Sequence, residues 1–128
     1  IKPQKIDIEV IDLCTVKPLD EKTILDSVRK TGHLLVIDSS WKDFGVASQV
    51  AAMVAEKGYE YLDGAIRRIG LPDIPSPSSP ALSKGYYPRA KNICQMIEEM
   101  LSVKIDISAF EEEMLPHDVP DPFFKGPF

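Results

Sequence analysis

Hydrophobic and polar positions recur with two different periods along the first third of the chain. Residues 6–13 alternate apolar with acidic side chains and are rich in β-branched residues, which predicts a strand. Residues 20–31 place their apolar side chains on one helical face, open with an aspartate that can cap a helix and end before Gly32, so they predict a helix. Residues 33–38 form a continuous apolar run, typical of a central strand buried on both faces of a parallel sheet.

The rest of the chain continues this alternation. Residues 39–45 are predicted as a loop, and residues 46–57 as a second helix whose apolar side chains recur at helical spacing. Residues 65–71 are predicted as a short third strand. Five prolines within residues 72–88 exclude regular structure there and predict a stiff surface crossover. An apolar stripe predicts the last long helix over 89–102, and this stripe is expected to face the core.

The order of these elements indicates the fold class. Strands that alternate with helices are typical of an α/β fold with a mostly parallel sheet, so we expect a three-layer sandwich around that sheet. Three strands make a thin sheet for two layers of helices, and an element is therefore expected to be missing at the N-terminal end. The residues before the first strand have no targeting character. One more short helix is predicted over 108–115.

Charge divides the chain into a neutral body and an acidic tail. The 128 residues fit one domain, with a net charge of -5. Residues 1–105 hold 14 basic and 14 acidic residues, whereas residues 106–128 hold six acidic residues and one lysine. We therefore expect an α/β domain over 1–105 and an acidic tail rich in proline and phenylalanine over 106–128. The tail suits either a solvated extension or a docking arm for a basic partner.

Composition excludes several classes of protein. The acidic balance argues against a nucleic-acid-binding protein, whose footprint is a basic patch. No apolar run reaches the length of about 18 residues that spans a membrane, so neither nucleic acid nor membrane is an expected partner. Cys14 and Cys94 lie too far apart in sequence for a zinc site or a disulfide framework, and they suit a reducing compartment.

Most signatures of catalysis are missing from the sequence. It contains no glycine-rich phosphate loop and no GxSxG elbow, and its two histidines are not at metal-ligand spacing. Ser39 and Ser40 lie near the end of a predicted strand, where α/β proteins often bind ligands. Two alternatives therefore stay open: a stand-alone ligand-binding or regulatory α/β domain with its ligand near residues 39–45, and a small hydrolase that uses one of these serines.

The loop before the second helix carries the most informative side chains. Trp41 is the only tryptophan, and Phe44 and Gly45 open the helix. A large aromatic residue there is either a lid on the core or an anchor for a contact, since interfaces are enriched in Trp and Phe. The alanine-rich helix that follows permits close approach by a second copy. The candidate dimer-interface residues are Trp41, Phe44, Gly45, Val46, Ala47 and Val50.

Four segments, taken together and in order, resemble the C-terminal domain of transketolase-like enzymes. The closer resemblance is to the beta subunit of the first component of 2-oxoacid dehydrogenases, such as the pyruvate and branched-chain enzymes. Cys14 stands where the family usually has arginine, and Ala47 where a second glycine is usual. The segments span about residues 5–102 and read VIDLCTVKPLD (10–20), SVRKTGHLLVID (27–38), WKDFGVASQVAAMV (41–54) and YLDGAIRRIGLPDIPSP (61–77).

The resemblance implies a fold and a division of labour. It implies an alternating sheet whose first strand and helix precede Ile1. It also implies that thiamine diphosphate and Mg belong to the full enzyme and are held by other parts of it, because the family's cofactor signature is not among the four segments. We therefore expect this domain to bind no cofactor or metal and to supply no catalytic residue.

The resemblance also implies partners. These are a second beta subunit, the alpha subunit and the lipoyl acyltransferase core, whose small basic subunit-binding domain docks on acidic groups near the two-fold axis of the beta pair. Asp63 lies where family members carry an acidic contact residue, and Glu60 is a neighbouring candidate. The implied parent reaction is oxidative decarboxylation of a 2-oxoacid with acyl transfer to lipoyl. The compartment is the cytoplasm in a bacterium and the mitochondrial matrix in a eukaryote.

Overall fold

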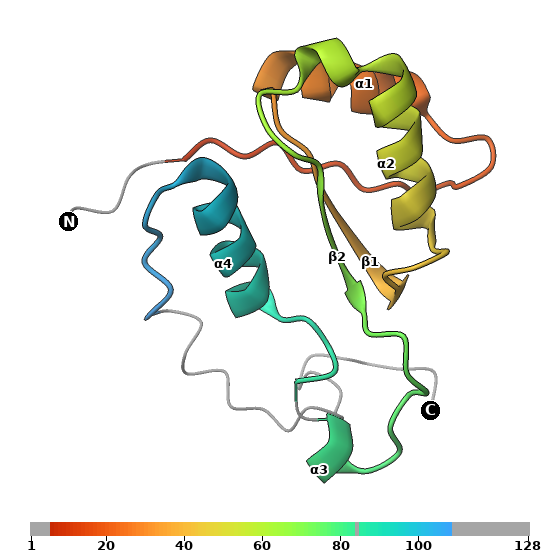
Figure 1. Ribbon diagram of the computed structural model, residues 1–128, viewed down its shortest axis with the longest axis vertical. Coiled ribbons are helices and arrows are strands. Elements are labelled where there is room, and N and C mark those ends of the chain that lie inside the picture. Colours follow the sequence, from red (N-terminus) through yellow and green to blue (C-terminus); the bar gives the residue numbers. More distant parts are fainter. Residues whose placement is uncertain (1–5, 84, 109–128) are drawn as a thin grey trace.

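Helices and strands alternate along the chain in the computed structural model, which describes residues 6–83 and 85–108 (Figure 1). None of the helices in these ranges is long and apolar enough to cross a membrane. In chain order, the elements are α1 (Glu21–Thr31), β1 (Leu35–Trp41), α2 (Val46–Lys57), the 3-10 turn η1 (Tyr59–Tyr61), β2 (Arg67–Leu71), α3 (Pro80–Ser83) and α4 (Ala90–Leu101).

The sheet consists of β1 and β2, which run parallel. Leu35 pairs with Arg67 and Ile37 with Ile69, and the register then shifts before Trp41 pairs with Leu71. Both strands therefore end at the same edge of the sheet. This parallel arrangement confirms the fold class that the alternating pattern predicted.

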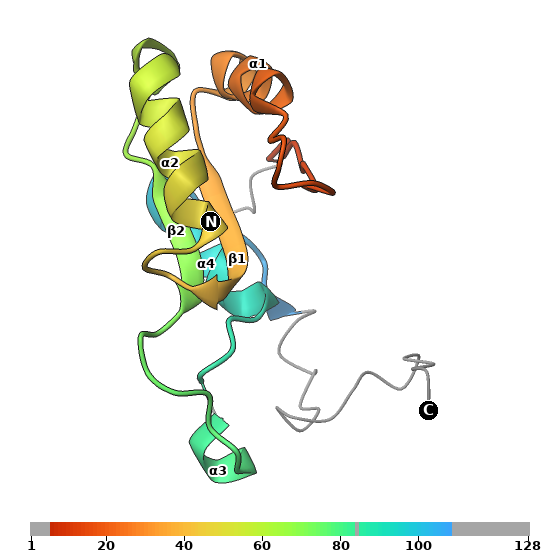
Figure 2. The same ribbon diagram turned by 90° about the vertical axis from the view of Figure 1, so that its right-hand side faces the viewer.

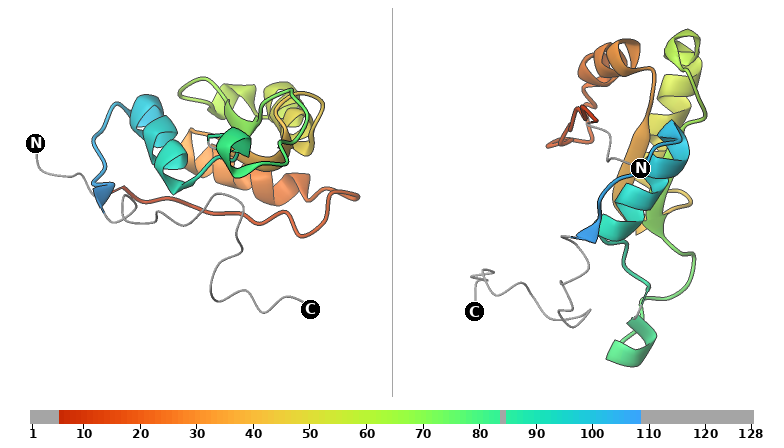
Figure 3. Two further views of the ribbon diagram at one scale, coloured as in Figure 1. Left: turned by 90° about the horizontal axis from the view of Figure 1, so that it is seen from below. Right: turned by 90° about the vertical axis from the view of Figure 1, so that its left-hand side faces the viewer.

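Helices cover the two strands from both sides. α2 packs against β1 and also touches β2, α1 packs on α2, and α4 contacts β2. Figures 2 and 3 show α2 and α4 on opposite sides of the strand pair. The predicted three layers are therefore present around a sheet of two described strands, with α1 and α2 forming one helical layer and α4 the other.

The core lies between α1, α2 and β1. Its buried side chains come from helical and strand positions that the apolar pattern placed inward. The helix cap of α1 is also as expected, because the backbone N–H of Thr23 donates to the side chain of Asp20 at 3.1 Å, and Gly32 ends the helix in a left-handed conformation. The core cluster comprises Ile24, Val28, Val36, Ala47, Val50, Met53 and Val54.

Two strand predictions were wrong. Residues 6–13 run extended, but no strand pairs with them in the part of the chain that the structure describes. An extended segment becomes a strand only where a neighbour accepts its backbone hydrogen bonds. β1 is not buried on both faces either, since Val36 is buried but Ile37 is half exposed. β1 also continues through residues 39–41, which were predicted as loop.

Three smaller differences concern the second half of the chain. The proline-rich segment 72–88 contains the short helix α3, which begins at a proline, the position where the missing N–H costs least. The apolar stripe of α4 is half-buried rather than part of the core. Of the tail, only residues 106–108 are described, so the short helix predicted over 108–115 and most of the acidic segment 106–128 lie outside the described residues. The first strand and helix expected ahead of Ile1 remain a prediction.

Candidate contact surfaces and cavity

One carboxylate organises the turn from β1 into α2. Asp38 Oδ1 accepts the backbone N–H of Ser40 at 2.9 Å, and Oδ2 accepts the N–H of Ala47 at 3.2 Å. Burial raises the pKa of Asp38, but the hydrogen bonds from Ser40, Ala47 and Val46 outweigh it, so this pKa lies below its ordinary value. The first turn of α2 has no acidic residue of its own. Asp38 therefore supplies the negative charge that a helix N-terminus favours.

β2 holds the other side of this turn. The backbone N–H of Lys42 donates to the carbonyl of Leu71 at 2.9 Å. Arg68 Nη1 donates to the Lys42 carbonyl at 2.8 Å and to Ser48 Oγ at 2.6 Å. Gly70 lets the backbone approach closely, because a Cβ added there would lie 2.9 Å from Lys42 Cα. The Ser48 hydroxyl donates to the Lys42 carbonyl at 3.4 Å, so residues on β2 and α2 fix the position of Lys42.

The turn nevertheless leaves its largest side chains in solvent. We call residues 41–46 the aromatic loop. Trp41 is 49% exposed and Phe44 is 100% exposed, so neither is a lid on the core. Phe44 also adopts a left-handed backbone conformation, with φ at 63°, which is uncommon for a residue other than glycine. The aromatic loop thus presents an exposed apolar surface on a well-anchored backbone.

Two of the six residues predicted for the dimer interface are buried in the single chain. Ala47 is 1% exposed and Val50 is 2% exposed, because both face the core under α2. Neither side chain reaches the surface of the single chain, and the dimer interface itself stays a prediction. The exposed part of that prediction consists of Trp41, Phe44 and Val46, with the backbone of Gly45 between them.

The predicted docking residues lie on a different surface. Glu60 and Asp63 are both exposed, in and just after η1, and we call them the acidic corner. The backbone N–H of Asp63 donates to the Gly32 carbonyl at 2.8 Å, and a Cβ on Gly32 would overlap the Asp63 carboxylate. Asp63 therefore packs over the end of α1. Nearby, the guanidinium of Arg29 lies 4.6 Å from the centre of the Tyr61 ring, so the acidic corner has a cationic neighbour.

The aromatic loop and the acidic corner lie at opposite ends of the sheet. Asp63 precedes β2 and packs on Gly32, which precedes β1, whereas Trp41 ends β1 (Figure 1). β1 has seven residues, and at about 3.3 Å per residue it separates the two surfaces by roughly 20 Å. The structure therefore does not bring the two groups of predicted residues together.

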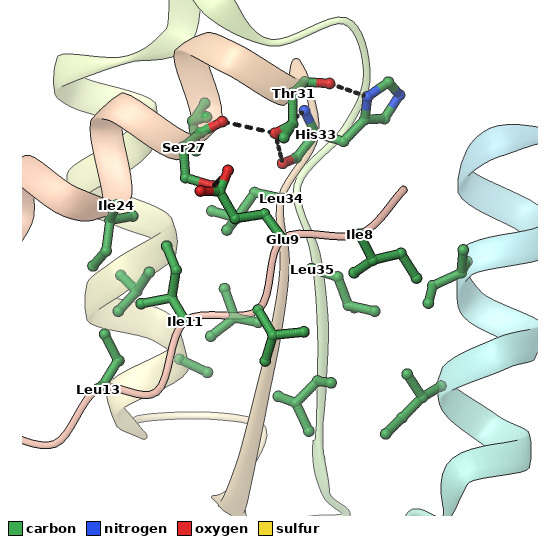
Figure 4. A pocket seen from close by; sticks show the side chains of 18 of the residues that line it. Ile8, Glu9, Ile11, Leu13, Ile24, Ser27, Thr31, His33, Leu34 and Leu35 are labelled. Carbon is green, nitrogen blue, oxygen red and sulfur yellow. Dashed lines mark hydrogen bonds between the residues drawn. The ribbon is translucent and has the colours of Figure 1, made fainter. Parts of the chain in front are cut away.

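A cavity of about 740 Å³ opens between the segment 6–13, α1, β1 and α4. Figure 4 shows aliphatic side chains from these elements pointing into it, with Glu9 and Ser27 among its polar groups. Glu9 Oε2 accepts the hydroxyl of Ser27 at 3.1 Å and lies 3.5 Å from Lys30 Nζ. The cavity lies between the N-terminal segment 6–13 and β1, two stretches that do not pair in the described part of the chain.

The cavity is lined by four carboxylates and one histidine as well as by aliphatic side chains. His33 lines it, but His33 Nδ1 lies 3.0 Å from the carbonyl of Thr31, which engages that nitrogen at the end of α1. No residue of 39–45 lines this cavity, but Asp38 and Val46 on either side of that segment do, so the cavity reaches the flanks of the place where a ligand was expected. The hydroxyl of Ser40 lies 3.5 Å from the Trp41 carbonyl, and His33 lies before the other end of β1. These positions give the serine-hydrolase alternative no support.

No observation on the described residues places a cofactor or its Mg here. Within 6–83 and 85–108, no three His, Cys, Asp or Glu side chains come together to hold a metal ion. Carboxylate and other oxygen ligands are what Mg requires beside the phosphates of a cofactor. We therefore derive no catalytic step through thiamine diphosphate on this part of the chain.

Comparison with known proteins decides the family. Residues 1–93 match the family model described as transketolase, C-terminal domain. The chain belongs to this family. The match covers most of the described transketolase C-terminal domain, including the aromatic loop and the acidic corner, and it confirms the resemblance found in the four sequence segments.

Several curated proteins are similar to this transketolase C-terminal domain. The pyruvate dehydrogenase E1 component subunit beta of Ascaris suum mitochondria is 39% identical over 100 residues, which are 77% of this chain and 28% of that protein. The corresponding Rickettsia bellii protein is 35% identical over 81% of this chain and 32% of its own length. The beta subunit of the Bacillus subtilis acetoin:2,6-dichlorophenolindophenol oxidoreductase is 40% identical over 75% of this chain and 28% of its own length. The chain thus spans about three tenths of the curated relatives it matches.

Sequence reasoning did not identify Asp38 and Arg68. A signal for Asp38 was present, because an acidic residue ended a predicted strand and preceded a helix without an acidic first turn. For Arg68 there was no such signal. Its partners, Lys42 and Ser48, are 26 and 20 positions away in the sequence.

Proposed function

We propose that this chain is an assembly and docking domain in the beta subunit of a thiamine-diphosphate-dependent 2-oxoacid dehydrogenase. The observation that carries the proposal is the family match over residues 1–93. Beta subunits of pyruvate and acetoin enzymes, with sequence identities of 34–40% to this chain, support it. The parent reaction would be oxidative decarboxylation of a 2-oxoacid with transfer of the acyl group to lipoyl. In this proposal other parts of the enzyme hold thiamine diphosphate and Mg, and this domain makes contacts between subunits.

The aromatic loop is proposed to contact a second copy of this domain. Exposed aromatic side chains on an anchored backbone are the usual centre of a protein interface. Phe44 is fully exposed and Trp41 half exposed at the start of α2, whose Ala52 and Ala55 are also exposed and small. A two-fold contact would place each aromatic loop beside the small side chains of the partner's α2. The alpha subunit is the other neighbour expected within the enzyme.

The first test measures self-association of the 128-residue chain by sedimentation equilibrium. We expect a dimer of twice 14.3 kDa, which dissociates when Trp41 or Phe44 is replaced by alanine. Tyr59→Ala is the matched control, because Tyr59 is 75% exposed at the other end of the sheet. A wild-type chain that stays monomeric at high concentration, or equal dissociation in the control, would contradict this role of the aromatic loop.

The acidic corner is proposed to receive the basic subunit-binding domain of the lipoyl acyltransferase. Glu60 and Asp63 are exposed, and attraction between opposite charges speeds encounter and weakens with added salt. Binding of an isolated subunit-binding domain, measured by calorimetry at two salt concentrations, tests this proposal. We expect Asp63→Lys to weaken binding by about tenfold or more and to remove most of the salt dependence. Asp73→Lys, at an exposed acid outside the acidic corner, is the control and should bind normally.

The cavity favours one second candidate function, a ligand-binding α/β domain. Its aliphatic lining suits an apolar ligand. Saturable binding of a fatty acid with 1:1 stoichiometry, lost in Leu35→Asp, would support this alternative against assembly.

The compartment follows the proposed role and the names of the relatives, which include mitochondrial and bacterial proteins. It would be the mitochondrial matrix in a eukaryote and the cytoplasm in a bacterium.

A further inference from the structure

We propose that Asp38 and Arg68 are positioning residues that hold the aromatic loop in its contact conformation before a partner arrives. Asp38 acts from the middle of β1 and Arg68 from β2. The proposal rests on the self-association proposed above for the loop's contact, whereas the positioning itself is a property of the single chain.

The hydrogen bonds of these two residues enclose the loop from both ends. Asp38 joins the N–H of Ser40, just before the loop, to the N–H of Ala47, just after it. Arg68 bonds the carbonyl of Lys42 inside the loop and the hydroxyl of Ser48 on α2. These two side chains thus act at the entry, the middle and the exit of the loop. The Lys42 carbonyl also accepts the Ser48 hydroxyl at 3.4 Å, and the Lys42 N–H donates to the Leu71 carbonyl.

The conformation fixed in this way contributes nothing to the core. Phe44 is fully exposed, and its positive φ costs free energy that no burial in the single chain offsets. Gly45 is needed for the same geometry, because a Cβ there would overlap Ser40 Oγ and lie 2.8 Å from the Trp41 carbonyl. A strained, exposed and anchored aromatic residue is what a preorganised contact requires, since ordering the loop in advance removes that cost from association.

Substitutions of equal size separate positioning from folding. In Asp38→Asn one carboxylate oxygen becomes an NH2 group, which cannot accept the N–H of Ser40 or Ala47 that it faces. Arg68→Met removes the donor and keeps an apolar stem in place. Asp43→Asn, at an exposed acid of the same loop, and Arg67→Met, at the exposed residue beside Arg68, are the matched controls.

Trp41 makes the test direct, because it is the only tryptophan. Acrylamide quenching and fluorescence anisotropy of Trp41 report loop order in dilute monomer, and sedimentation equilibrium gives the dimer dissociation constant. Far-UV circular dichroism reports whether the helices remain. For Asp38→Asn and Arg68→Met we expect stronger quenching, lower anisotropy and a dissociation constant raised about tenfold, with helix content unchanged. Both controls should match the wild type.

Each outcome decides the proposal. Unchanged quenching in both variants overturns it, because the loop is then held without these residues. Looser loops with an unchanged dissociation constant overturn it as well, since positioning would then not matter for contact. If wild type does not self-associate, the second copy fails as the occupant. The Trp41 measurements then decide alone whether Asp38 and Arg68 position the loop. If Asp38→Asn loses helix content, Asp38→Glu is measured in its place. This substitution keeps the charge and should restore association in part.

Discussion

At the scale of single residues, close backbone approach and one carboxylate decide the shape of the aromatic loop. Asp38 accepts N–H groups from both flanks of the loop, and Gly70 leaves room for the backbone of Lys42. Neither the hydrogen bonds of Asp38 nor the close approach at Gly70 depends on a large buried area. Small substitutions at these positions are therefore expected to change the stability of the loop strongly.

Gly70→Ala tests the close approach of β2 to the loop. The added Cβ would lie 2.9 Å from Lys42 Cα and 3.0 Å from Lys42 N, so the backbone must shift. We expect the free energy of unfolding to fall by about 1–3 kcal/mol in chemical denaturation. Gly64→Ala is the control, since its Cβ would meet only His33 Nε2 at 4.0 Å. Equal effects of the two substitutions would contradict the packing argument.

The order of the loop should depend on pH through Asp38. The hydrogen bonds hold the pKa of this carboxyl below 3.8, its ordinary value, so the ionised form stabilises the folded loop. That stabilisation is fully present above pH 3.8 and is lost as pH falls through the lower folded-state pKa. Acid titration of Trp41 fluorescence should show this transition below pH 3.8 in the wild type. A transition of the same midpoint in Asp38→Asn would assign it to another group.

At the scale of elements, the two helical layers differ in how firmly they are held. α2 contributes four buried residues and packs on β1, β2 and α1. α4 contributes no buried residue, and its apolar side chains line the open cavity beside β1. α4 should therefore open more easily than α2, which hydrogen exchange of the two helices can measure.

Truncation of one apolar residue in each helix tests this difference. Met53→Ala in α2 removes a side chain that is 2% exposed and should lower the free energy of unfolding by about 2–5 kcal/mol. Ile97→Ala in α4 removes a half-buried side chain at the cavity and should cost about 1 kcal/mol or less. Denaturant unfolding compares them, and a larger loss for Ile97→Ala would show that another structure covers α4 in solution.

At the scale of the whole molecule, the sheet separates two contact surfaces. The aromatic loop lies at the carboxyl end of β1 and the acidic corner at the amino end of β2. Effects of substitutions more than about 7–10 Å apart usually add. The proposed dimer contact and the proposed docking contact should therefore respond to separate substitutions.

A double substitution tests this independence. Phe44→Ala should weaken self-association and leave binding of the basic subunit-binding domain unchanged, and Asp63→Lys should do the reverse. The double variant should show both losses in full, in sedimentation and calorimetry respectively. If Phe44→Ala alone also weakens binding of the basic subunit-binding domain, that domain needs the dimer of this chain. Its docking surface then includes residues near the two-fold axis of the dimer.

Local pattern was enough to predict most elements and the family. α2 begins and ends where apolar periodicity predicted, α1 begins one residue later than predicted, and α4 is one residue shorter than predicted at each end. Helical periodicity and capping depend on residues three or four apart, so a single segment contains the whole signal. The four segments that resembled the transketolase C-terminal domain were specific for the same reason, since their order and spacing are properties of the chain alone.

Contacts between distant segments needed the tertiary structure. Residues 6–13 have the alternation of a strand, yet pairing requires a neighbour, and the cavity lies between them and β1. Ala47 and Val50 shared a predicted surface with Phe44, but the packing of α2 on β1 buried the first two and left Phe44 in solvent. Arg68 joins Lys42 and Ser48 across the fold. The sequence by itself determined the three long helices α1, α2 and α4 and the family of the chain. Burial, strand pairing and loop position depend on which segments meet in space, and only the tertiary structure decided those.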